Sequence, residues 1–383
     1  MQYHALALAA AGRDVVLLGY RGAPPDREVL EHPRIRVELL PTPWRQRAPR
    51  ALYLPASLAD VVAQTGLLVR RLVATRAGEL LVQTPPAIPT LAVARLAARL
   101  LGARLVVDWH NFGADLLALR LGRTHPAVRA AAAFERVAGT GAGAHLCVSE
   151  AMRVELRRRY AIDATVLRDR PARRAPRPSA DERAALFSRL AVAAHPGTRV
   201  VATSSSWTLD EDFALLLDAL ARCDAALRAR PELPPLLFLV TGAGPLREAW
   251  EREVARLALA RVSVRTLWVA SEDYPRLLAA ADIGVSLHRS ASGVDLPMKI
   301  ADMFGAGLPV CALAYGPVIH ELVRPGENGL LFEDAATLAG QIVELCAEPD
   351  GRLEELRRGV ARHGAIGWIE GWRTEAAPLF APS

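Results

Sequence analysis

The chain has 383 residues, 51% of them apolar and 23% charged, with a formal net charge of +6. This composition is typical of a globular protein and excludes a disordered chain, while the length favours two domains. No run of about 18 uncharged apolar residues occurs, so we expect no transmembrane helix. The four cysteines show no metal-ligand spacing, which predicts free thiols in a reducing compartment. The arginines are dispersed, and aromatic residues make up only 5%, which argues against a nucleic-acid binder.

At the start of the chain, the apolar pattern of Met1–Ala11 predicts an amphipathic helix that ends at Gly12. A Rossmann-like domain should begin with a strand and a glycine-rich turn before such a helix, and both are missing here. Loss of a central parallel strand would leave backbone groups unpaired, so we expect the natural chain to begin upstream of Met1.

Short apolar runs that alternate with helical stretches follow in the first half. They predict strands over Val15–Tyr20, Ile35–Leu40, Leu80–Gln83, Arg104–Trp109, His145–Val148 and Thr165–Leu167. Continuous apolar runs are typical of strands buried on both faces of a parallel sheet. The segment 51–78 reads as a helix that carries Arg70, Arg71 and Arg76. Contact with a lipid surface and packing on the domain explain this helix equally well.

The stretch "VVDWHNFG" places polar side chains at the carboxyl end of a strand, where active sites form in α/β proteins. His110, or a neighbouring acid, could act as a base near neutral pH, and Asp108 and Asn111 lie at the same strand end. The alternative is a loop histidine that is simply hydrogen-bonded.

A proline- and arginine-rich linker begins at residue 168. Ser179 and Glu182 then have the spacing of a capping box. In the second half, strands are predicted over Val200–Thr203, Leu236–Thr241, Val262–Trp268, Ile283–Leu287, Val310–Leu313 and Leu330–Phe332. We therefore expect an amino-terminal domain over 1–167, a linker and helix over 168–195, a carboxyl-terminal domain over 196–360 and a helical tail over 361–383.

Two turns of the second half suggest a nucleotide loop. In "SSSWTLDED", Ser205 and Ser206 could donate to phosphate oxygens, and Thr208 with Glu211 has the spacing of a capping box. A capped helix after a polar turn explains much of this pattern without a ligand. In "VTGAGP", the glycines Gly242 and Gly244 leave room for a ligand, although a Gly-x-Gly turn alone is a weak signal.

Lys299 is the only lysine in the chain. Asp295 is expected to cap a helix whose first turn holds Leu296 and Pro297, which places Lys299 and Asp302 on one face. A helix start beside a lysine predicts a phosphate site, and a carboxylate one turn later could accept ribose hydroxyls. The alternative interpretations are a surface ion pair and a lysine retained by chance.

Taken together, the segments resemble the chitobiosyldiphosphodolichol β-mannosyltransferase family. The resemblance rests on "MQYHALALA", "VQTPPAIPTLAVA", "VVDWHNFG", "CVSEAMRVEL", "SSSWTLDEDFALLLDAL", "TGAGPL", the long segment "EDYPRLLAAADIGVSLHRSASGVDLPMKIADMFGAGLPVC" and "HELVRPGENGLLFED". It implies the α/β GT-B fold, with two Rossmann-like domains and, in this chain, an apparently missing first strand. It also implies inverting transfer of mannose from GDP-mannose, forming a β-1,4 linkage to a lipid-diphosphate-linked chitobiose, without a metal or other cofactor.

The resemblance suggests roles for individual residues. The catalytic residues would be His110, Asp108 and Lys299. The acceptor-binding residues would be Gln83, Pro85, His110 and Asn111. The donor-binding residues would be Ser205, Ser206, Trp207, Gly242, Gly244, Trp268, Ser292, Gly293, Asp295, Leu296, Lys299 and Asp302.

The same resemblance leaves rival functions open. A glycosyltransferase that uses a UDP-sugar, and a non-catalytic nucleotide-sugar-binding protein, both fit the residues. The arginine richness suggests a bacterial protein, in which a cytoplasmic location with peripheral contact at the inner membrane face would be expected and the lipid carrier could differ.

Overall fold

The computed structural model describes residues 1–22, 24–41, 53–171, 173–195, 197–208, 211–290, 292–347, 351–364 and 366–380, apart from the side chains of 53–61 and 120. The chain forms two compact units, one of Met1–Arg168 with Trp368–Ser383 and one of Asp169–Gly367. The expected helical tail, 361–383, is therefore not a separate part of the fold. Its first residues, up to Gly367, belong to the second unit, and the rest belong to the first unit. The first boundary lies within one residue of the predicted position.

The second unit is built on one parallel sheet of six strands in the order β12-β11-β10-β7-β8-β9. The strands are β7 Arg199–Ser204, β8 Leu236–Thr241, β9 Val262–Leu267, β10 Ile283–Ser286, β11 Val310–Leu313 and β12 Gly329–Phe332. Strands β8, β10 and β11 are buried along their whole length. Their apolar runs are thus covered on both faces, as the sequence predicts.

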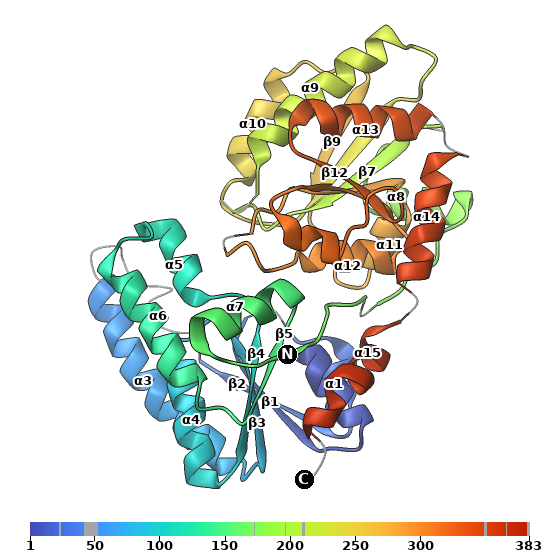
Figure 1. The fold of residues 1–383 in the computed structure, drawn as a ribbon. Coiled ribbons are helices and arrows are strands. Elements are labelled where there is room, and N and C mark those ends of the chain that lie inside the picture. Colours follow the sequence, from blue (N-terminus) through green and yellow to red (C-terminus); the bar gives the residue numbers. More distant parts are fainter. Residues whose placement is uncertain are drawn as a thin grey trace. The chain divides into compact units, whose positions relative to one another are not determined.

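Helices cover both faces of this sheet (Figure 1). One face packs against α9 Phe213–Ala229, α10 Arg247–Arg256 and α13 Ala335–Ala347. The other face packs against α8 Ala180–Arg189, α11 Tyr274–Ala279 and α12 Met298–Gly305, and α14 Arg352–His363 follows at the end of the unit. The predicted capping box of α8 is confirmed, because Ser179 and Glu182 exchange both hydrogen bonds.

The first unit contains two separate parallel sheets in place of one. The smaller sheet pairs β1 Val15–Tyr20 with β2 Ile35–Leu40, and the larger has the order β3-β4-β5-β6, from Glu79–Thr84, Arg104–Trp109, Ala144–Cys147 and Thr165–Val166. A cavity of about 1040 Å³ lies between β1 and β3. The sheet of the first unit is therefore interrupted between β1 and β3, as the absence of a first strand predicts.

Helices α3 Tyr53–Ala74, α4 Thr90–Leu101 and α6 Pro126–Gly139 lie on one side of the first unit, while α1 Gln2–Ala10 and α15 Trp368–Glu375 lie together on the other (Figure 1). The other α-helices described in this unit are α2 Arg27–Glu31, α5 Gly113–Leu121 and α7 Glu150–Tyr160. The segment 51–78 does form a helix, α3, and this helix packs on α4. Among the described residues, no helix has the length and apolar character needed to cross a membrane.

Candidate functional site

In the second unit, the loops after β7 and β10 meet at the point where the strand order reverses. From β7 the chain proceeds outward through β8 and β9, and β10 then pairs on the opposite side of β7. Ligands of open α/β sheets bind at the carboxyl ends of the strands at such a switch point. A β-bridge between Glu211 and His288 joins the two loops.

Lys299 lies in the first turn of α12 and reaches the loop after β7. Its Nζ is 2.6 Å from Glu211 Oε1, and the side chain of Glu211 is 1% exposed. The interpretation of Lys299 as half of an ion pair is therefore partly right, but the partner is Glu211 and not Asp302. This pair holds the sole lysine at the switch point.

Glu211 does not cap α9, so the predicted capping box with Thr208 is wrong. Its Oε2 accepts hydrogen bonds from Ser205 Oγ at 2.7 Å and from the Ser206 backbone N–H at 3.0 Å. Asp212 caps α9 instead and accepts from the Leu215 backbone N–H. The Glu211 carboxylate pairs with Lys299, which lies 88 residues away, and therefore does not bind the backbone N–H groups at the start of α9.

The two glycines of the loop after β8 allow this loop to touch the loop after β7. A Cβ on Gly242 would lie 1.8 Å from the Ser205 carbonyl oxygen, and one on Gly244 would lie 2.1 Å from the Ser206 carbonyl oxygen. Gly242 also has a φ of +137°, which side chains rarely adopt. The structure thus brings Ser205, Ser206, Gly242 and Gly244 together, as the sequence predicts. Helix α10 begins at Arg247, two residues after Pro245.

Asp295 does not cap α12, which corrects a second expectation. The helix begins at Met298, its N-cap is Pro297, and no side chain makes a capping hydrogen bond. The Asp295 carboxylate instead accepts from Ser290 Oγ and Ser292 Oγ and lies 3.0 Å from His288 Nε2. Burial alone would raise the pKa of Asp295, but these hydrogen bonds and the His288 charge lower it. The carboxylate therefore organises the loop before α12.

Asp302 lies on α12 and is half-buried. Burial raises its pKa to about 6, the nearby Asp169 charge adds to the rise, and Arg173 opposes it. The Tyr274 hydroxyl is 2.7 Å from Ser204 Oγ. Burial raises the pKa of Tyr274, and the Asp302 charge adds to the rise. A buried carboxylate with a raised pKa is typical of a functional site, although structural networks also produce one.

The other predicted donor residues differ in exposure. The Trp207 side chain is completely buried and stacks on Phe213 with ring centroids 4.9 Å apart, so its ring belongs to the core and cannot face a ligand. Trp268 is 71% exposed. Ser292, Gly293 and Leu296 are half-buried in the loop between β10 and α12.

In the first unit, two histidines converge on Asp108 near the carboxyl end of β4. His110 Nε2 lies 2.7 Å and His4 Nε2 lies 3.0 Å from the same oxygen, Asp108 Oδ2. Burial alone would raise the pKa of Asp108, but the charges and hydrogen bonds of His110 and His4 outweigh it and hold the pKa well below its usual range. Asp108 is therefore an ionised acceptor that orients both rings.

Trp372 of α15 fixes the tautomer of the neutral His4 ring. Trp372 Nε1 lies 3.1 Å from His4 Nδ1, and an indole nitrogen only donates. His4 Nδ1 must therefore accept, so the proton of the neutral ring is on Nε2 and points to Asp108. Neither His4 nor Trp372 was predicted as a site residue. The segment around His4 read as a helix face, and no motif marks Trp372, which lies 368 residues from its partner.

The predicted acceptor residues lie at the same edge of the sheet. Gln83 pairs in register with Asp108 across β3 and β4, and Pro85 follows the end of β3. The Asn111 side chain accepts from the Phe112 backbone N–H at 2.8 Å. His4, Asp108 and His110 also offer ligand atoms within 4.8 Å of one another, a spacing at which a metal ion can be shared.

Comparison with known proteins follows the division of the fold. Residues 2–171 match the family model of the glycosyl transferase 4-like domain, and residues 198–348 match that of glycosyl transferases group 1. A solved structure of Anabaena Alr3699/HepE, in complex with UDP and glucose, superposes with a TM-score of 0.69 over 99% of this chain and 95% of that one, at 20% identity. This likeness shows the two-domain GT-B fold.

Closer similarity is found among curated proteins. The mouse chitobiosyldiphosphodolichol beta-mannosyltransferase is 36% identical over 418 residues, which span 100% of this chain and 86% of the mouse protein. A protein of Arthroderma benhamiae with the same name is 40% identical over 91% of this chain and 82% of its own length. The UDP-glycosyltransferase TURAN of Arabidopsis thaliana is 38% identical over 99% of this chain and 93% of its own.

Proposed function

Since the chain belongs to the chitobiosyldiphosphodolichol beta-mannosyltransferase family, we propose that it transfers mannose from GDP-mannose to a chitobiose linked to a lipid diphosphate, with inversion and a β-1,4 linkage. It is a glycosyltransferase. The observation that carries the proposal is the similarity to named mannosyltransferases over the whole chain. The site chemistry described above supports it.

In the second unit, Lys299 and the start of α12 would neutralise the donor diphosphate. Negative charge grows on this leaving group as its bond to the sugar breaks, and fixed cationic donors there lower the barrier. An ammonium group has three donors, so Lys299 can hold Glu211 and a phosphate oxygen at once. The Ser206 hydroxyl at the same loop would add a donor, while the single Ser205 hydroxyl proton is directed to Glu211. Asp302 would accept the ribose hydroxyls.

In the first unit, His110 would remove the proton from the acceptor hydroxyl. Asp108 keeps the ring oriented and stabilises the imidazolium that forms, and His4 binds the same oxygen of Asp108. A positioned base of this kind contributes about 10²–10⁴-fold to a rate. Gln83, Pro85 and Asn111, at the same sheet edge, would contact the acceptor. The reaction is proposed to need no metal, so EDTA should leave the rate unchanged.

The experiment that tests the proposal is incubation of the protein with GDP-mannose and a short-chain isoprenyl diphosphate chitobiose. The expected product, identified by mass spectrometry, is the acceptor with one added hexose, and β-mannosidase should remove this hexose. Absence of the hexose adduct, despite binding of the donor, would favour a non-catalytic nucleotide-sugar-binding protein instead.

A UDP-sugar is the second candidate donor, because one relative of similar identity carries the name of a UDP-glycosyltransferase. A thermal-shift series with GDP-mannose, UDP-glucose and UDP-N-acetylglucosamine separates the two candidates, because a ligand of the folded state raises the melting temperature. We expect the largest rise with GDP-mannose.

We also propose that the protein is a cytoplasmic, peripheral enzyme of the inner membrane face in a bacterium, where a lipid-linked acceptor would be encountered. The formal net charge of +6 and the arginines of α3 support attraction to anionic lipid. Flotation with vesicles that contain 30% phosphatidylglycerol should carry the protein to the top of the gradient, and pure phosphatidylcholine vesicles should not.

A further inference from the structure

A basic pocket of about 920 Å³ lies in the second unit, separate from the loops of the switch point. Its walls are residues 173–178, one face of α8 and the start of α11. The face of α8 contributes Glu182, Ala185, Leu186 and Arg189, whose spacing of three and four residues places them on one side of a helix. Among the described residues that line this pocket, none belongs to the proposed donor site.

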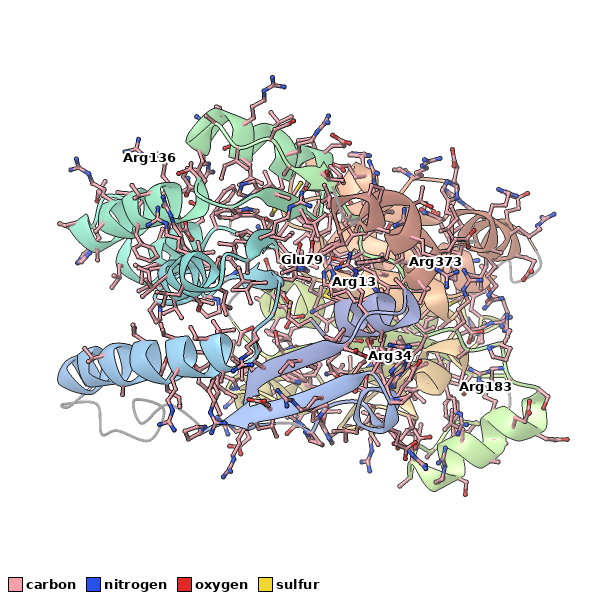
Figure 2. The ribbon with its side chains drawn as sticks, turned by 90° about the horizontal axis from the view of Figure 1, so that it is seen from below. Arg13, Arg34, Glu79, Arg136, Arg183 and Arg373 are labelled. Atoms are coloured by element: carbon pink, nitrogen blue, oxygen red, sulfur yellow. The ribbon has the colours of Figure 1, made fainter. Side chains whose placement is uncertain are left out.

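Asp282 lies next to one end of the pocket and is shared by four arginines. Its side chain is 1% exposed, directly before β10. Arg177, which lines the pocket, donates to Asp282 Oδ1 at 3.2 Å, and Arg183 of α8 (Figure 2) donates to Oδ2 at 3.2 Å. The other two arginines are Arg199 and Arg357. One carboxylate therefore neutralises only part of the charge of Arg177.

This cluster holds more positive than negative charge. Glu354 also pairs with Arg357, so two carboxylates face four guanidinium groups. Burial lowers the pKa of Arg357, and the Arg177 charge adds to the fall. The Nε atoms of Arg183 and Arg199 are buried and have no hydrogen-bond partner in the part of the chain that the structure describes. Buried donors without an acceptor are typical of a place where an anion or a water molecule binds.

At the other end of the pocket, two arginines share Asp273. Arg189 donates to Asp273 Oδ1 at 2.7 Å, and a terminal nitrogen of Arg276 lies 3.7 Å from the same oxygen. Both arginine side chains are more than half exposed, at 54% and 66%. Their guanidinium groups are therefore accessible to a ligand in the pocket.

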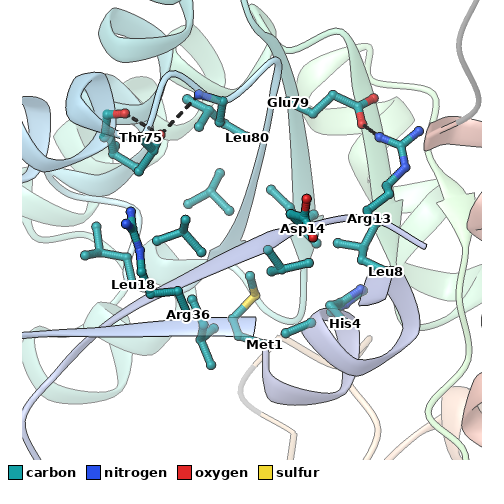
Figure 3. A pocket seen from close by; sticks show the side chains of 18 of the residues that line it. Met1, His4, Leu8, Arg13, Asp14, Leu18, Arg36, Thr75, Glu79 and Leu80 are labelled. Carbon is teal, nitrogen blue, oxygen red and sulfur yellow. Dashed lines mark hydrogen bonds and ion pairs between the residues drawn. The ribbon is translucent and has the colours of Figure 1, made fainter. Parts of the chain in front are cut away.

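Arginines are concentrated at this pocket beyond the bias of the whole chain. They make up five of its thirteen described lining residues, whereas 47 of the 383 residues of the chain are lysine or arginine. The cavity between β1 and β3 has five arginines among 29 described lining residues (Figure 3). The lining of the basic pocket includes two acids, Glu182 and Glu272. Composition alone therefore does not explain its charge.

We propose that this pocket binds a soluble, phosphate-bearing small molecule with two or more negative charges, as a second ligand site apart from the donor site. Guanidinium groups form forked hydrogen bonds with phosphate oxygens, and here they converge from residues 173–178, α8 and α11. Pro176, Pro178 and Leu186 offer apolar walls to the rest of the ligand. The volume is in the range of small-molecule sites. Nucleoside polyphosphates combine an anionic part with such an apolar part.

The test titrates the full chain with ATP, and separately with adenosine, in magnesium-free buffer by isothermal titration calorimetry. ATP should bind and adenosine should not, because the phosphates carry the interaction. Arg177→Gln with Arg189→Gln should weaken ATP binding about tenfold or more, since one hydrogen bond between charged groups contributes about a factor of ten. The double variant should fold, because Asp282 and Asp273 each keep another arginine. Equal binding of adenosine would overturn the proposal.

The matched control is Arg222→Gln with Arg256→Gln. It removes the same charge from α9 and α10, where each arginine pairs with an acid of its own helix, and it should bind ATP as the original chain does. Lys299→Met with Glu211→Gln alters the donor site and should also retain this ATP site. Equal weakening in the pocket and control variants would contradict the proposal. Loss of ATP binding in the donor-site variant alone would contradict it too.

If Arg177→Gln with Arg189→Gln does not fold, modification of the original chain by phenylglyoxal decides. ATP should slow the modification of Arg177 and Arg189 about tenfold and leave Arg222 and Arg256 unaffected, as read by mass spectrometry. Absence of this protection would reject the proposal. So would protection by phosphatidylglycerol vesicles without protection by ATP, because the ligand would then be a lipid headgroup.

Discussion

Lys299 Nζ and Glu211 Oε1, 2.6 Å apart, tie the start of α12 to the loop after β7. A buried carboxylate without its cation is destabilising by about 3–5 kcal/mol. Removal of Lys299 therefore has two effects that must be separated: loss of a phosphate ligand and loss of the partner of Glu211.

We expect Lys299→Ala to lower transfer by about 10²–10³-fold and also to lower the melting temperature. Lys299→Arg should impair transfer too, because the guanidinium differs in reach and geometry. The control is the double variant Lys299→Met with Glu211→Gln, which removes both charges and should recover stability without recovering activity. Full activity in the double variant would contradict the role given to Lys299.

Asp302 should make the protein less stable as the pH rises. Its pKa is raised from 3.8 to about 6, so the folded state binds a proton more tightly than the unfolded chain. The resulting stability is complete below about pH 4 and is lost as the pH rises through 6. Asp302→Asn should therefore raise the free energy of unfolding at pH 7.5 by up to about 3 kcal/mol and change it little at pH 4.

The same variant should weaken donor binding at pH 7.5, because an amide is a poorer acceptor for ribose hydroxyls than a carboxylate. Urea unfolding at the two pH values and the KM for the donor measure the two effects. An unchanged donor KM would remove Asp302 from the donor site while leaving the stability prediction intact.

Trp372→Phe should disturb catalysis through His4. Without the indole donor, His4 Nδ1 can carry the proton, and Asp108 then loses one of its two histidine donors. We expect kcat to fall less than the 10²–10⁴-fold expected for His110→Ala, with a shifted pH–rate profile. Nitrogen chemical shifts of His4 should report the altered tautomer.

Trp368→Phe is the matched control, because Trp368 Nε1 donates to the Tyr3 carbonyl oxygen and not to His4. Trp368→Phe should lower the free energy of unfolding by about as much as Trp372→Phe, since both residues lie in α15. It should leave the pH–rate profile unchanged. Identical profiles for both variants would assign Trp372 a purely structural role.

Gly242→Ala should destabilise the second unit by about 3 kcal/mol or more. The added Cβ would collide with the Ser205 carbonyl oxygen at a φ that side chains rarely adopt. Gly340→Ala, in the exposed interior of α13, meets no atom within 4 Å and should instead stabilise by about 0.5–1 kcal/mol. Thermal unfolding of the two variants measures the contrast.

Most of the fold could be predicted from the sequence, because local patterns determine it. The apolar runs placed every strand end within one residue, and the capping box of Ser179 and Glu182 is present as expected. The caps proposed for Asp295 and Glu211 are wrong because each carboxylate has stronger partners: His288 and serines for Asp295, and Lys299 for Glu211.

The candidate sites could be predicted only where a motif was local. Asp108 and His110 lie two residues apart, and the sequence "VVDWHNFG" pointed to both. His4 and Trp372 join them from opposite ends of the chain, through contacts that only the folded sheet and α15 create. Trp207 was predicted to bind the donor because it lies in the loop after β7, but its ring packs in the core against Phe213.

The return of α15 to the first unit has a consequence for biosynthesis. Residues 169–367 form a contiguous unit that can fold as soon as it has emerged from the ribosome. The first unit must wait, because Trp368 and Trp372 complete its hydrophobic core and are translated after the whole second unit. During this interval the earlier-made half exposes apolar surface, and chaperone dependence should concentrate there.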